Sequence, residues 1–356
     1  MTSIDERPFG IWQDKQPVDS YILRNRHGMS ATVIPVGASL QSLCVPDRQG
    51  HIKDIVLGFD QPSDYAVNHP YLGCTVGRFA NRIADARFEL DGRSFALTTN
   101  AGSDHLHGGD IGISRRLWGA VMERDAQSGV HSVSFYLDSP DGEDGYPGNL
   151  SLRVRYSLDD NRCLAIEYFA RSDKKTVINL TNHSYFNLNG HASGAIGDHV
   201  LRVFASRYTP TDDNLLPTGS IDDVEDPIDF RKPRPIGDEL GNPMLAHTGG
   251  YDHNYVLDKN DQRMALAAVL LSPTSGIRMA VTTSEPAMQL YTANSLALDN
   301  GKTGTGYLRH EAVCLETQGF PDAPNQPHFP DATLEADSLF YSKTIYRFDT
   351  VGDTDA

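Results

Sequence analysis

The sequence has little positive charge. Of its 356 residues, 31 are Lys or Arg and 47 are Asp or Glu, which gives a formal net charge of −16. No run of basic residues interrupts this acidic balance, so nucleic acid and anionic membrane surfaces are not expected partners. The same balance disfavours a phosphorylated substrate, although a local arginine cluster could override it.

Cysteines and long apolar runs are also scarce. Cys44, Cys74, Cys163 and Cys314 form no CxxC or CxH pair and lie in or beside apolar stretches, which is typical of buried, reduced thiols. No window approaches the roughly 18 uninterrupted apolar residues of a membrane-spanning helix. The N-terminal stretch lacks the apolar core of a signal peptide. These absences predict a soluble, cytoplasmic protein.

Helical periodicity is nearly absent, and only short turns at 61–68 and 237–241 fit it. Alternation with a period of two is common instead. It runs through 150–156 and, after the polar break at 159–161, through 163–170, which predicts an antiparallel hairpin. The stretch 87–97 predicts a second hairpin around an Asp-Gly turn, a pair that tolerates the positive φ values of a type I′ turn. Further strands are expected at 31–36, 39–45, 52–58, 130–138, 175–180, 199–204, 267–272, 277–283, 288–293 and 311–316.

Short strands punctuated by 31 glycines and 20 prolines are typical of an all-β fold, a mostly antiparallel sandwich or barrel. The chain shows no linker, low-complexity tract or fixed-period repeat. We therefore expect a single β domain over residues 1–356.

Five segments place polar residues in apolar or glycine-rich surroundings, where a scaffold alone does not require them. They are "GRFANRI" with Asn81 and Arg82, "HLHGG" with His105 and His107, "INLTNHSYFNLNG" with His183, "GGYDHNYVL" with Asp252 and His253, and "AVCLETQGFPDAPNQPHFP" with Glu316.

Each segment also has a purely structural interpretation. Arg82 could form a surface salt bridge, His183 could cap a strand, and Asp252 could make an Asx turn. His105 and His107 have the spacing of two metal ligands on one strand face. However, no cysteine or second cluster accompanies them, so hydrogen-bonded structural histidines are favoured over a metal site.

The last segment carries the clearest signal. Glu316 follows an apolar run whose alternate residues are apolar on both faces, which indicates a central, buried strand ending in a carboxylate. Proline then recurs at every third position from 321 to 330. A solvated strand end, an exposed polyproline ligand, or a catalytic carboxylate followed by a stiff wall would each fit. Because the segment follows a buried strand and carries Phe320 and Phe329, we favour a rigid loop that walls a cleft.

Acid–base chemistry on a hydroxyl-rich ligand would use these residue types together. A glutamate partly removed from water has a raised pKa and is a competent base, while a histidine can donate a proton on the opposite side of the reacting group. Asn, Arg and Asp side chains provide directional hydrogen bonds of both polarities, and neighbouring Tyr and Phe rings provide flat apolar faces. The set indicates a sugar site.

At the level of motifs, the sequence resembles the aldose 1-epimerase (galactose mutarotase) family. The resemblance covers roughly residues 70 to 330 and rests on an ordered set of motifs. Besides the motifs already quoted, the set contains "SPDGEDGYPGNL", "TPTDDNLLPTG" and "MQLYTANSL". It implies a large antiparallel β-sandwich with its active site in an open cleft. It also implies the interconversion of aldohexose anomers without a cofactor or a metal, so the expected partner is a small aldose sugar.

The resemblance also implies roles for individual residues. Glu316 would take the proton from the C1 hydroxyl, and His183 would protonate the ring oxygen. Arg82 and His107 would hold sugar oxygens near the reacting end, with Asn81 assisting Arg82, and His107 could also help the proton transfer. Asp252 would accept hydrogen bonds from ring hydroxyls, and Gln289 would line the same cleft. His105 and His253 are expected to be structural.

One segment departs from the family pattern. The family often continues its "HGG" motif with "GFDKVLW", whereas this chain has "GISRRLW" at 112–118. The departure bears on cleft-edge packing or substrate preference, because no expected catalytic residue lies there.

Three other functions compete with that of an epimerase. A non-catalytic sugar-binding β-sandwich would not need both an acid and a base. A glycoside hydrolase would need a second carboxylate, and Asp252 is the candidate for it. A phosphohexose mutarotase would need more arginines than the pair Arg115 and Arg116.

Overall fold

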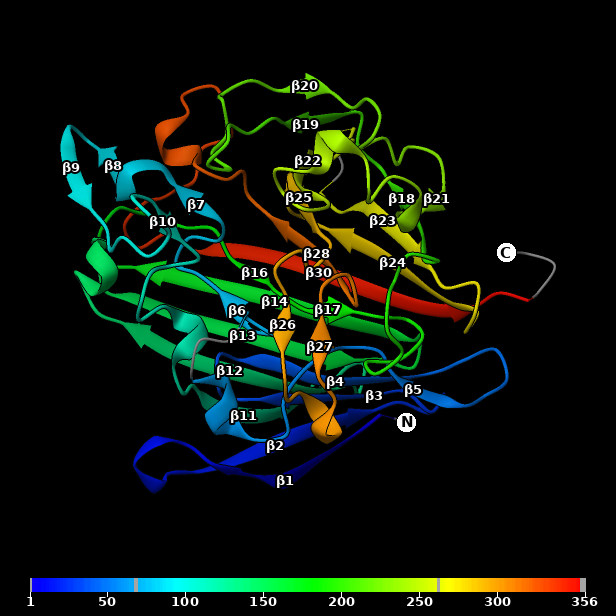
Figure 1. The fold of residues 1–356 in the computed structure, drawn as a ribbon. Coiled ribbons are helices and arrows are strands. Elements are labelled where there is room, and N and C mark those ends of the chain that lie inside the picture. Colours follow the sequence, from blue (N-terminus) through cyan, green and yellow to red (C-terminus); the bar gives the residue numbers. More distant parts are fainter. Residues whose placement is uncertain (1, 67–69, 261–262, 353–356) are drawn as a thin grey trace.

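The computed structural model describes residues 2–66, 70–260 and 263–352, in which three large antiparallel sheets are joined by loops and short 3₁₀ turns (Figure 1). No α-helix occurs in these ranges, and none of their helical turns is long and apolar enough to cross a membrane. The all-β prediction is confirmed.

The largest sheet has nine strands, and its central strand is β30, at the C-terminal end of the chain. Strand β30 lies between β14 and β24, so the last strand joins two halves of the sheet. In sheet order the strands are β11 (Gly119–Arg124), β12 (His131–Ser139), β13 (Leu150–Leu158), β14 (Cys163–Ser172), β30 (Phe340–Thr350), β24 (Ile277–Thr283), β23 (Ala265–Leu271), β18 (Val200–Val203) and β21 (Arg234–Pro235).

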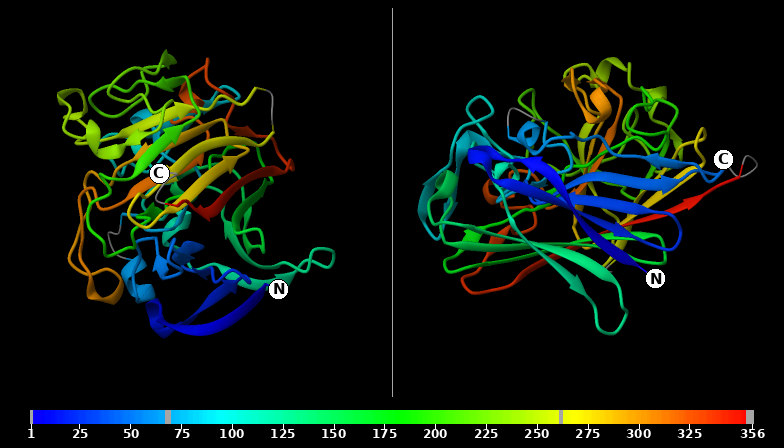
Figure 2. Two further views of the ribbon diagram at one scale, coloured as in Figure 1. Left: turned by 90° about the vertical axis from the view of Figure 1, so that its right-hand side faces the viewer. Right: turned by 90° about the horizontal axis from the view of Figure 1, so that it is seen from below.

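Two further sheets pack on the nine-stranded one. Figure 2 shows the N-terminal sheet as a layer beside β11–β14, and side chains of the three large sheets share one hydrophobic core. The N-terminal sheet has the order β1 (Ser3–Ile11), β2 (Pro17–Arg24), β3 (Ser30–Ile34), β4 (Ser39–Pro46) and β5 (Ile52–Asp54). The six-stranded sheet has the order β17 (Tyr185–Phe186), β28 (Val313–Gln318), β25 (Ala287–Tyr291), β22 (Asp252–Val256), β19 (Arg207–Thr209) and β20 (Asp222–Asp223).

Short strand pairs and turns connect the sheets. The pairs are β6 (Thr75–Val76) with β16 (Thr181–Asn182), β7 (Arg82–Ile83) with β10 (His105–Leu106), β8 (Arg87–Leu90) with β9 (Arg93–Ala96), β15 (Thr176–Val177) with β29 (Thr333–Leu334), and β26 (Ala297–Leu298) with β27 (Tyr307–Leu308). The 3₁₀ turns are η1 (Gln13–Lys15), η2 (Pro62–Tyr65), η3 (Ala84–Ala86), η4 (Ile113–Arg115), η5 (Glu143–Gly145), η6 (Ile236–Asp238), η7 (Pro243–Leu245), η8 (Lys302–Gly304) and η9 (Ala323–Asn325).

Both predicted hairpins are confirmed. Strands β13 and β14 pair antiparallel, and β8 pairs with β9 through a turn in which Asp91 and Gly92 have φ values of 50° and 72°. These are the left-handed conformations that a type I′ turn requires. Both predicted turns are 3₁₀, at η2 and η6, although residues 67 and 68 of the first lie outside the described ranges.

Several predicted strands differ in extent. The stretch 52–58 is a strand only to Asp54, and 175–180 is a strand only at Thr176–Val177. The strand containing Glu316 continues to Gln318, so Glu316 lies inside the strand and not at its end. All six residues of β28 are buried between β17 and β25, which confirms the prediction of a central strand.

Candidate active site

A row of polar side chains crosses one face of the six-stranded sheet. The strand register pairs Thr209 with Asn254, Asn254 with Gln289, and Gln289 with Glu316. The intervening residues of the same strands, such as Met288, belong to the hydrophobic core. Because alternate residues of a strand point to opposite faces, the same strands provide the core on one face and the site on the other.

A second row lies beside the first. Asp252 pairs with Tyr291, and Tyr291 pairs with Cys314. The two rows are joined where Gln289 Nε2 donates a hydrogen bond of 2.6 Å to Asp252 Oδ1. The register of four strands therefore sets the positions of seven side chains.

Both rows border a cavity of about 350 Å³. Every residue that the sequence placed in the site lines it. The lining residues are Pro70, Tyr71, Asn81, Arg82, Leu106, His107, His183, Tyr185, Thr209, Thr211, Leu215, His247, Thr248, Asp252, Asn254, Gln289, Tyr291, Asn294, Ser295, Glu316 and Pro321.

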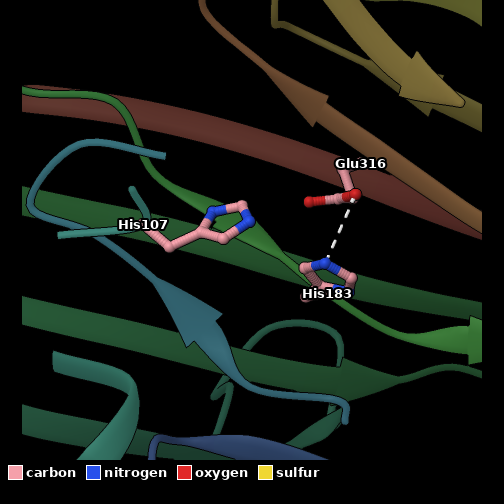
Figure 3. A group of neighbouring side chains, drawn as sticks. All are labelled: His107, His183 and Glu316. Atoms are coloured by element: carbon pink, nitrogen blue, oxygen red, sulfur yellow. Dashed lines mark ion pairs between the residues drawn. The ribbon is translucent and has the colours of Figure 1, made fainter. Parts of the chain in front are cut away.

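The predicted acid and base face each other in this cavity. His183 Nε2 lies 3.6 Å from Glu316 Oε1, and both residues are buried (Figure 3). Burial, with a smaller contribution from the negative charge of Asp252, raises the pKa of Glu316 well above its usual value. A carboxylate with a raised pKa is a stronger base than one at the surface. A protonated His183 would favour the ionised form of Glu316 across this distance.

Aromatic rings surround His183. It stacks on Tyr185 at 4.9 Å and on Tyr71 at 5.9 Å between ring centroids. The rings of His107 and Tyr291 meet it edge to face at 5.4 Å and 6.2 Å. These contacts fix the plane of the imidazole, so its two nitrogens have defined directions.

His107 is held by a tight turn in "HLHGG". The turn requires glycine at 108, where φ is 88° and a Cβ would lie 1.7 Å from the carbonyl oxygen of Gly77. The backbone N–H of Asn81 donates to His107 Nδ1 at 3.1 Å. Burial lowers the pKa of His107 well below its usual value, and His183 and Arg82 contribute in the same direction. His107 is therefore a neutral ring with its proton on Nε2, which makes it a donor toward the cavity.

His107, His183 and Glu316 also form a cluster whose potential ligand atoms lie within 4.8 Å of one another (Figure 3). A metal ligand must offer a lone pair. In His107, Nδ1 already accepts the Asn81 N–H and Nε2 carries the ring proton. We therefore assign no metal to this cluster.

Arg82 and Asp252 supply opposite charges to the cavity. Arg82 forms no ion pair with a carboxylate in the described ranges, so the alternative of a surface salt bridge is not met there. Burial raises the pKa of Asp252, while its bond to Gln289 and the charge of Arg82 act against this shift. Asn81 accepts the backbone N–H of Arg82 through its side-chain oxygen at 2.8 Å, which fixes the start of β7.

The proline-rich segment forms part of the wall. Only Pro321 among its prolines lines the cavity. The next residue, Asp322, donates its N–H to the carbonyl of Arg82 at 2.8 Å and accepts the N–H of Ala84 at 3.0 Å. The segment thus connects β28 to the strand that carries Arg82.

The two histidines expected to be structural lie outside the cavity lining. His105 is bonded through its ring to the carbonyl of Thr98 at 2.7 Å and to the hydroxyl of Tyr146 at 2.6 Å. His253 accepts the N–H of Asp252 at 3.0 Å and packs on Tyr251.

Some residues that line the cavity were not predicted from the sequence. Asn254 and Tyr291 each follow a predicted site residue by two positions, so strand alternation could have found them. Tyr71 and His247 had no such signal, because loops bring them to the cavity.

Three buried acceptors in the first row have no hydrogen-bond partner in the described ranges. They are Asn254 Oδ1, Gln289 Oε1 and Glu316 Oε2. An unsatisfied buried polar atom costs about 1–3 kcal/mol, so such atoms call for a ligand or water. Three acceptors in one row suit a ligand with several hydroxyl groups.

The fold and this cavity together define a class of protein, a β-sandwich whose cavity holds a buried carboxylate–imidazole pair and acceptors suited to a polyhydroxylated ligand. Comparison with known proteins identifies the family. The family model for aldose 1-epimerase matches residues 19–347. Galactose mutarotase of Bos taurus is 42% identical over 318 residues, covering 89% of this chain and 90% of its own length. Aldose 1-epimerase of Escherichia coli K12 is 35% identical over 349 residues, covering 97% and 99%.

A solved structure agrees with this assignment. Galactose 1-epimerase from Lactobacillus acidophilus NCFM superposes with a TM-score of 0.86 at 29% identity, covering 99% of this chain and 100% of that one. The chain belongs to the aldose 1-epimerase family, and it is an isomerase.

Proposed function

We propose that this protein interconverts the α and β anomers of aldohexoses such as galactose and glucose, with Glu316 as the base and His183 as the acid. The observation that carries the proposal is the 3.6 Å contact between His183 Nε2 and Glu316 Oε1 in a buried cavity. The names of the relatives, galactose mutarotase and aldose 1-epimerase, support the same reaction. We further propose that residues 1–356 act as one epimerase domain.

The reaction needs two proton transfers in each direction. Glu316 takes the proton of the C1 hydroxyl while His183 gives one to the ring oxygen, and the ring opens to the free aldehyde. Rotation about C1–C2 then exposes the other face of the aldehyde. Closure returns both protons, because microscopic reversibility makes the same two residues act in both directions.

The remaining site residues would bind the sugar. Arg82 and the Nε2–H of His107 would donate to oxygens near the reacting end, with Asn81 fixing the position of both. Asp252 would accept hydrogen bonds from ring hydroxyls. Gln289, oriented by Asp252, would present its free Oε1 to another hydroxyl. The acceptors without partners would thus gain donors when the sugar binds.

Nothing in the site favours the alternative of a non-catalytic binder. Burying a carboxylate against an imidazole is costly, and a binding site does not need it. The phosphohexose alternative has no support either, because Arg116 is paired with Glu143 at 2.7 Å and Arg115 is not among the cavity-lining residues.

Polarimetry of freshly dissolved α-D-galactose and α-D-glucose tests the proposal. We expect wild type to speed the approach to anomeric equilibrium. The variants Glu316→Gln and His183→Asn, checked for folding by circular dichroism, should each lose about 100-fold to 10,000-fold in kcat. If wild type binds the sugar but mutarotation is no faster than in buffer alone, the enzyme assignment fails and the protein is a sugar-binding protein.

A further inference from the structure

The imidazole of His183 lies across two side chains that leave β28 on the same face. Its Nε2 is 3.6 Å from Glu316 Oε1, and its Nδ1 is 3.5 Å from Cys314 Sγ. Residues two apart on a strand share a face, so the sequence Cys-Leu-Glu supplies one contact for each ring nitrogen. The proposed mechanism uses the contact with Glu316 and leaves Cys314 without a role.

The sulfur is held firmly in this position. Cys314 is fully buried, and its Cα pairs with those of Tyr185 and Tyr291 on the two neighbouring strands. Tyr185 is also the ring on which His183 stacks. The backbone register of three strands therefore places both the sulfur and the stacking ring against the imidazole.

We propose that Cys314 is a positioning residue, whose sulfur accepts a hydrogen bond from Nδ1–H of His183 and so leaves the transferable proton on Nε2. The inference rests on the acid role proposed for His183. During the transfer, the bond between Nε2 and its proton breaks as an O–H bond forms at the sugar ring oxygen. The proton on Nδ1 stays in place, and the thiol keeps its own proton.

A thiol suits this role because it is a neutral, weak acceptor. Burial, followed by the negative charges of Glu316 and Asp252, raises the pKa of Cys314 well above its usual value, so the sulfur remains a thiol. A carboxylate at Nδ1 would stabilise the imidazolium by charge and make it a poorer acid. The sulfur orients the ring with little of that stabilisation.

A simpler account is that Cys314 is only a small residue that fits its space. Three substitutions separate the two accounts. Cys314→Ala removes the acceptor, Cys314→Ser restores one of similar size, and Cys314→Val restores volume without an acceptor. Cys74→Ala is the matched control, because Cys74 is equally buried but its sulfur contacts the hydroxyl of Ser39 at 3.2 Å.

We expect Cys314→Ala and Cys314→Val to lower kcat roughly twofold to threefold, the value at the weak end of the usual range for one hydrogen bond, with KM changed less than about twofold. Cys314→Ser should recover most of the loss, and Cys74→Ala should match wild type. Wild-type kcat in Cys314→Ala, or recovery by Val instead of Ser, would overturn the proposal.

A readout independent of turnover completes the test. The ¹⁵N shifts of the His183 ring, assigned by comparison with His183→Asn, should show Nδ1 protonated in the neutral ring of the wild type. A mixture of both tautomers is expected in Cys314→Ala. If the ¹⁵N shifts in Cys314→Ala equal those of the wild type, the positioning role of Cys314 is contradicted, while the acid role of His183 is not affected. Full activity of His183→Asn would instead show that the acid assignment itself is wrong.

Discussion

Gln289 and Asp252 are joined by a hydrogen bond of 2.6 Å, from the amide nitrogen of one to a carboxylate oxygen of the other. The bond fixes which way the amide points and leaves its oxygen directed at the cavity without a partner in the described ranges. It also holds the Asp252 charge within range of Glu316, whose pKa that charge helps to raise.

The first prediction concerns this charge. Asp252→Asn keeps an acceptor for Gln289 but removes a negative charge beside Glu316, so the pKa of Glu316 should fall. The base works only when it is deprotonated. The low-pH limb of the kcat profile should therefore move to lower pH, as measured by initial rates of mutarotation between pH 4 and 8. A limb that stays in place would show that Asp252 does not act on the base.

The second prediction concerns Glu285, which burial gives a pKa of about 7, with no role in the proposed reaction. A carboxyl group whose pKa is higher in the folded chain contributes stability that is fully present below the unfolded value and is lost as pH rises. The loss here falls between about pH 4.5 and 7 and reaches about 3 kcal/mol.

Glu285→Gln should remove this loss. The variant should gain stability relative to wild type as pH rises from 5 to 7.5, measured by urea unfolding. If the free energies of unfolding of the variant and the wild type differ by the same amount at pH 5 and pH 7.5, the pKa of Glu285 lies near its ordinary value.

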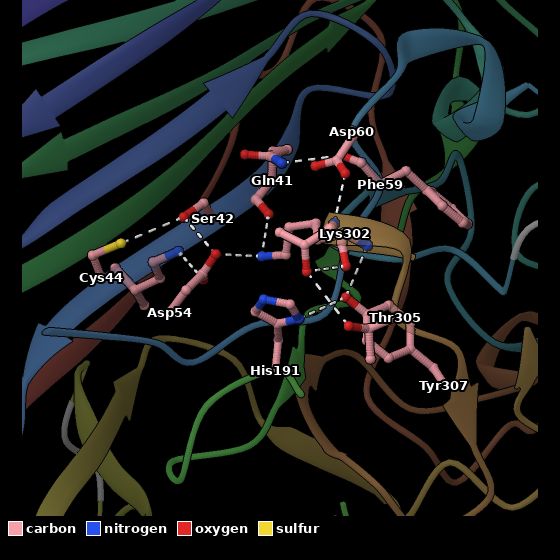
Figure 4. A network of polar contacts seen from close by, with 12 residues as sticks. Gln41, Ser42, Cys44, Asp54, Phe59, Asp60, His191, Lys302, Thr305 and Tyr307 are labelled. Carbon is pink, nitrogen blue, oxygen red and sulfur yellow. Dashed lines mark hydrogen bonds and ion pairs between the residues drawn. The ribbon is translucent and has the colours of Figure 1, made fainter. Parts of the chain in front are cut away.

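A third prediction addresses the ion pair between Lys302 and Asp54, neither of which lines the cavity. Lys302 Nζ lies 2.6 Å from Asp54 Oδ2 and also donates to the carbonyl of Gln41 at 3.0 Å (Figure 4). The lysine is buried, and the pair links η8 to β4 and β5. Breaking a fully buried pair by removing one partner typically costs about 3–5 kcal/mol, and the 21% exposure of the Asp54 side chain reduces that cost here.

Lys302→Met should therefore lower Tm strongly while leaving kcat of the surviving folded enzyme unchanged. The double variant Lys302→Met/Asp54→Asn should regain part of the stability, because the partly buried carboxylate of Asp54 is then no longer left without its cation. Thermal scans of the three proteins compare these values. A single variant as stable as wild type would mean that the pair contributes nothing.

The fourth prediction concerns the segment that departs from the family pattern. The guanidinium of Arg115 lies 5.9 Å from the ring centroid of Tyr71, which in turn packs against His107 at 4.7 Å. A cation–π contact is worth about 0.5–1 kcal/mol at such sites. Arg115→Ala should lower kcat about twofold to fivefold, and Arg115→Lys should retain most of the activity. An effect on the ratio of galactose to glucose activity would show that this segment influences substrate preference.

Much of the site could be predicted because its motifs are local. Glu316, Gln289 and Asp252 sit on strands, and the period-two pattern that places one of them on the site face also places Asn254 and Tyr291 there. The assembly of the cavity could not be predicted, because it depends on pairing between strands distant in sequence, such as β25 with β28.

Strand β30 was missed for a different reason. Its inward positions include Ser342 and Thr344, and polar residues at core positions hide the alternation. Thr344 is satisfied by hydroxyl contacts with Thr317 at 2.5 Å and Thr283 at 3.1 Å, which no local pattern reveals. The strand predicted over 175–180 is longer than the observed one because its residues have different partners. Thr176–Val177 pair with β29, whereas Asn179 forms an isolated bridge with Phe79.

Strands β25 and β28 each present one face to the core and the other to the cavity, which limits the insertions and deletions that they can accept. Met288 and Leu315 face the core while Gln289 and Glu316 face the cavity, so a one-residue insertion or deletion within either strand would exchange the two sets. Such a change would remove the function and the packing at once. We therefore expect the loops that flank β25 and β28 to tolerate changes of length better than the strands do, so those loops are where an altered specificity can be engineered.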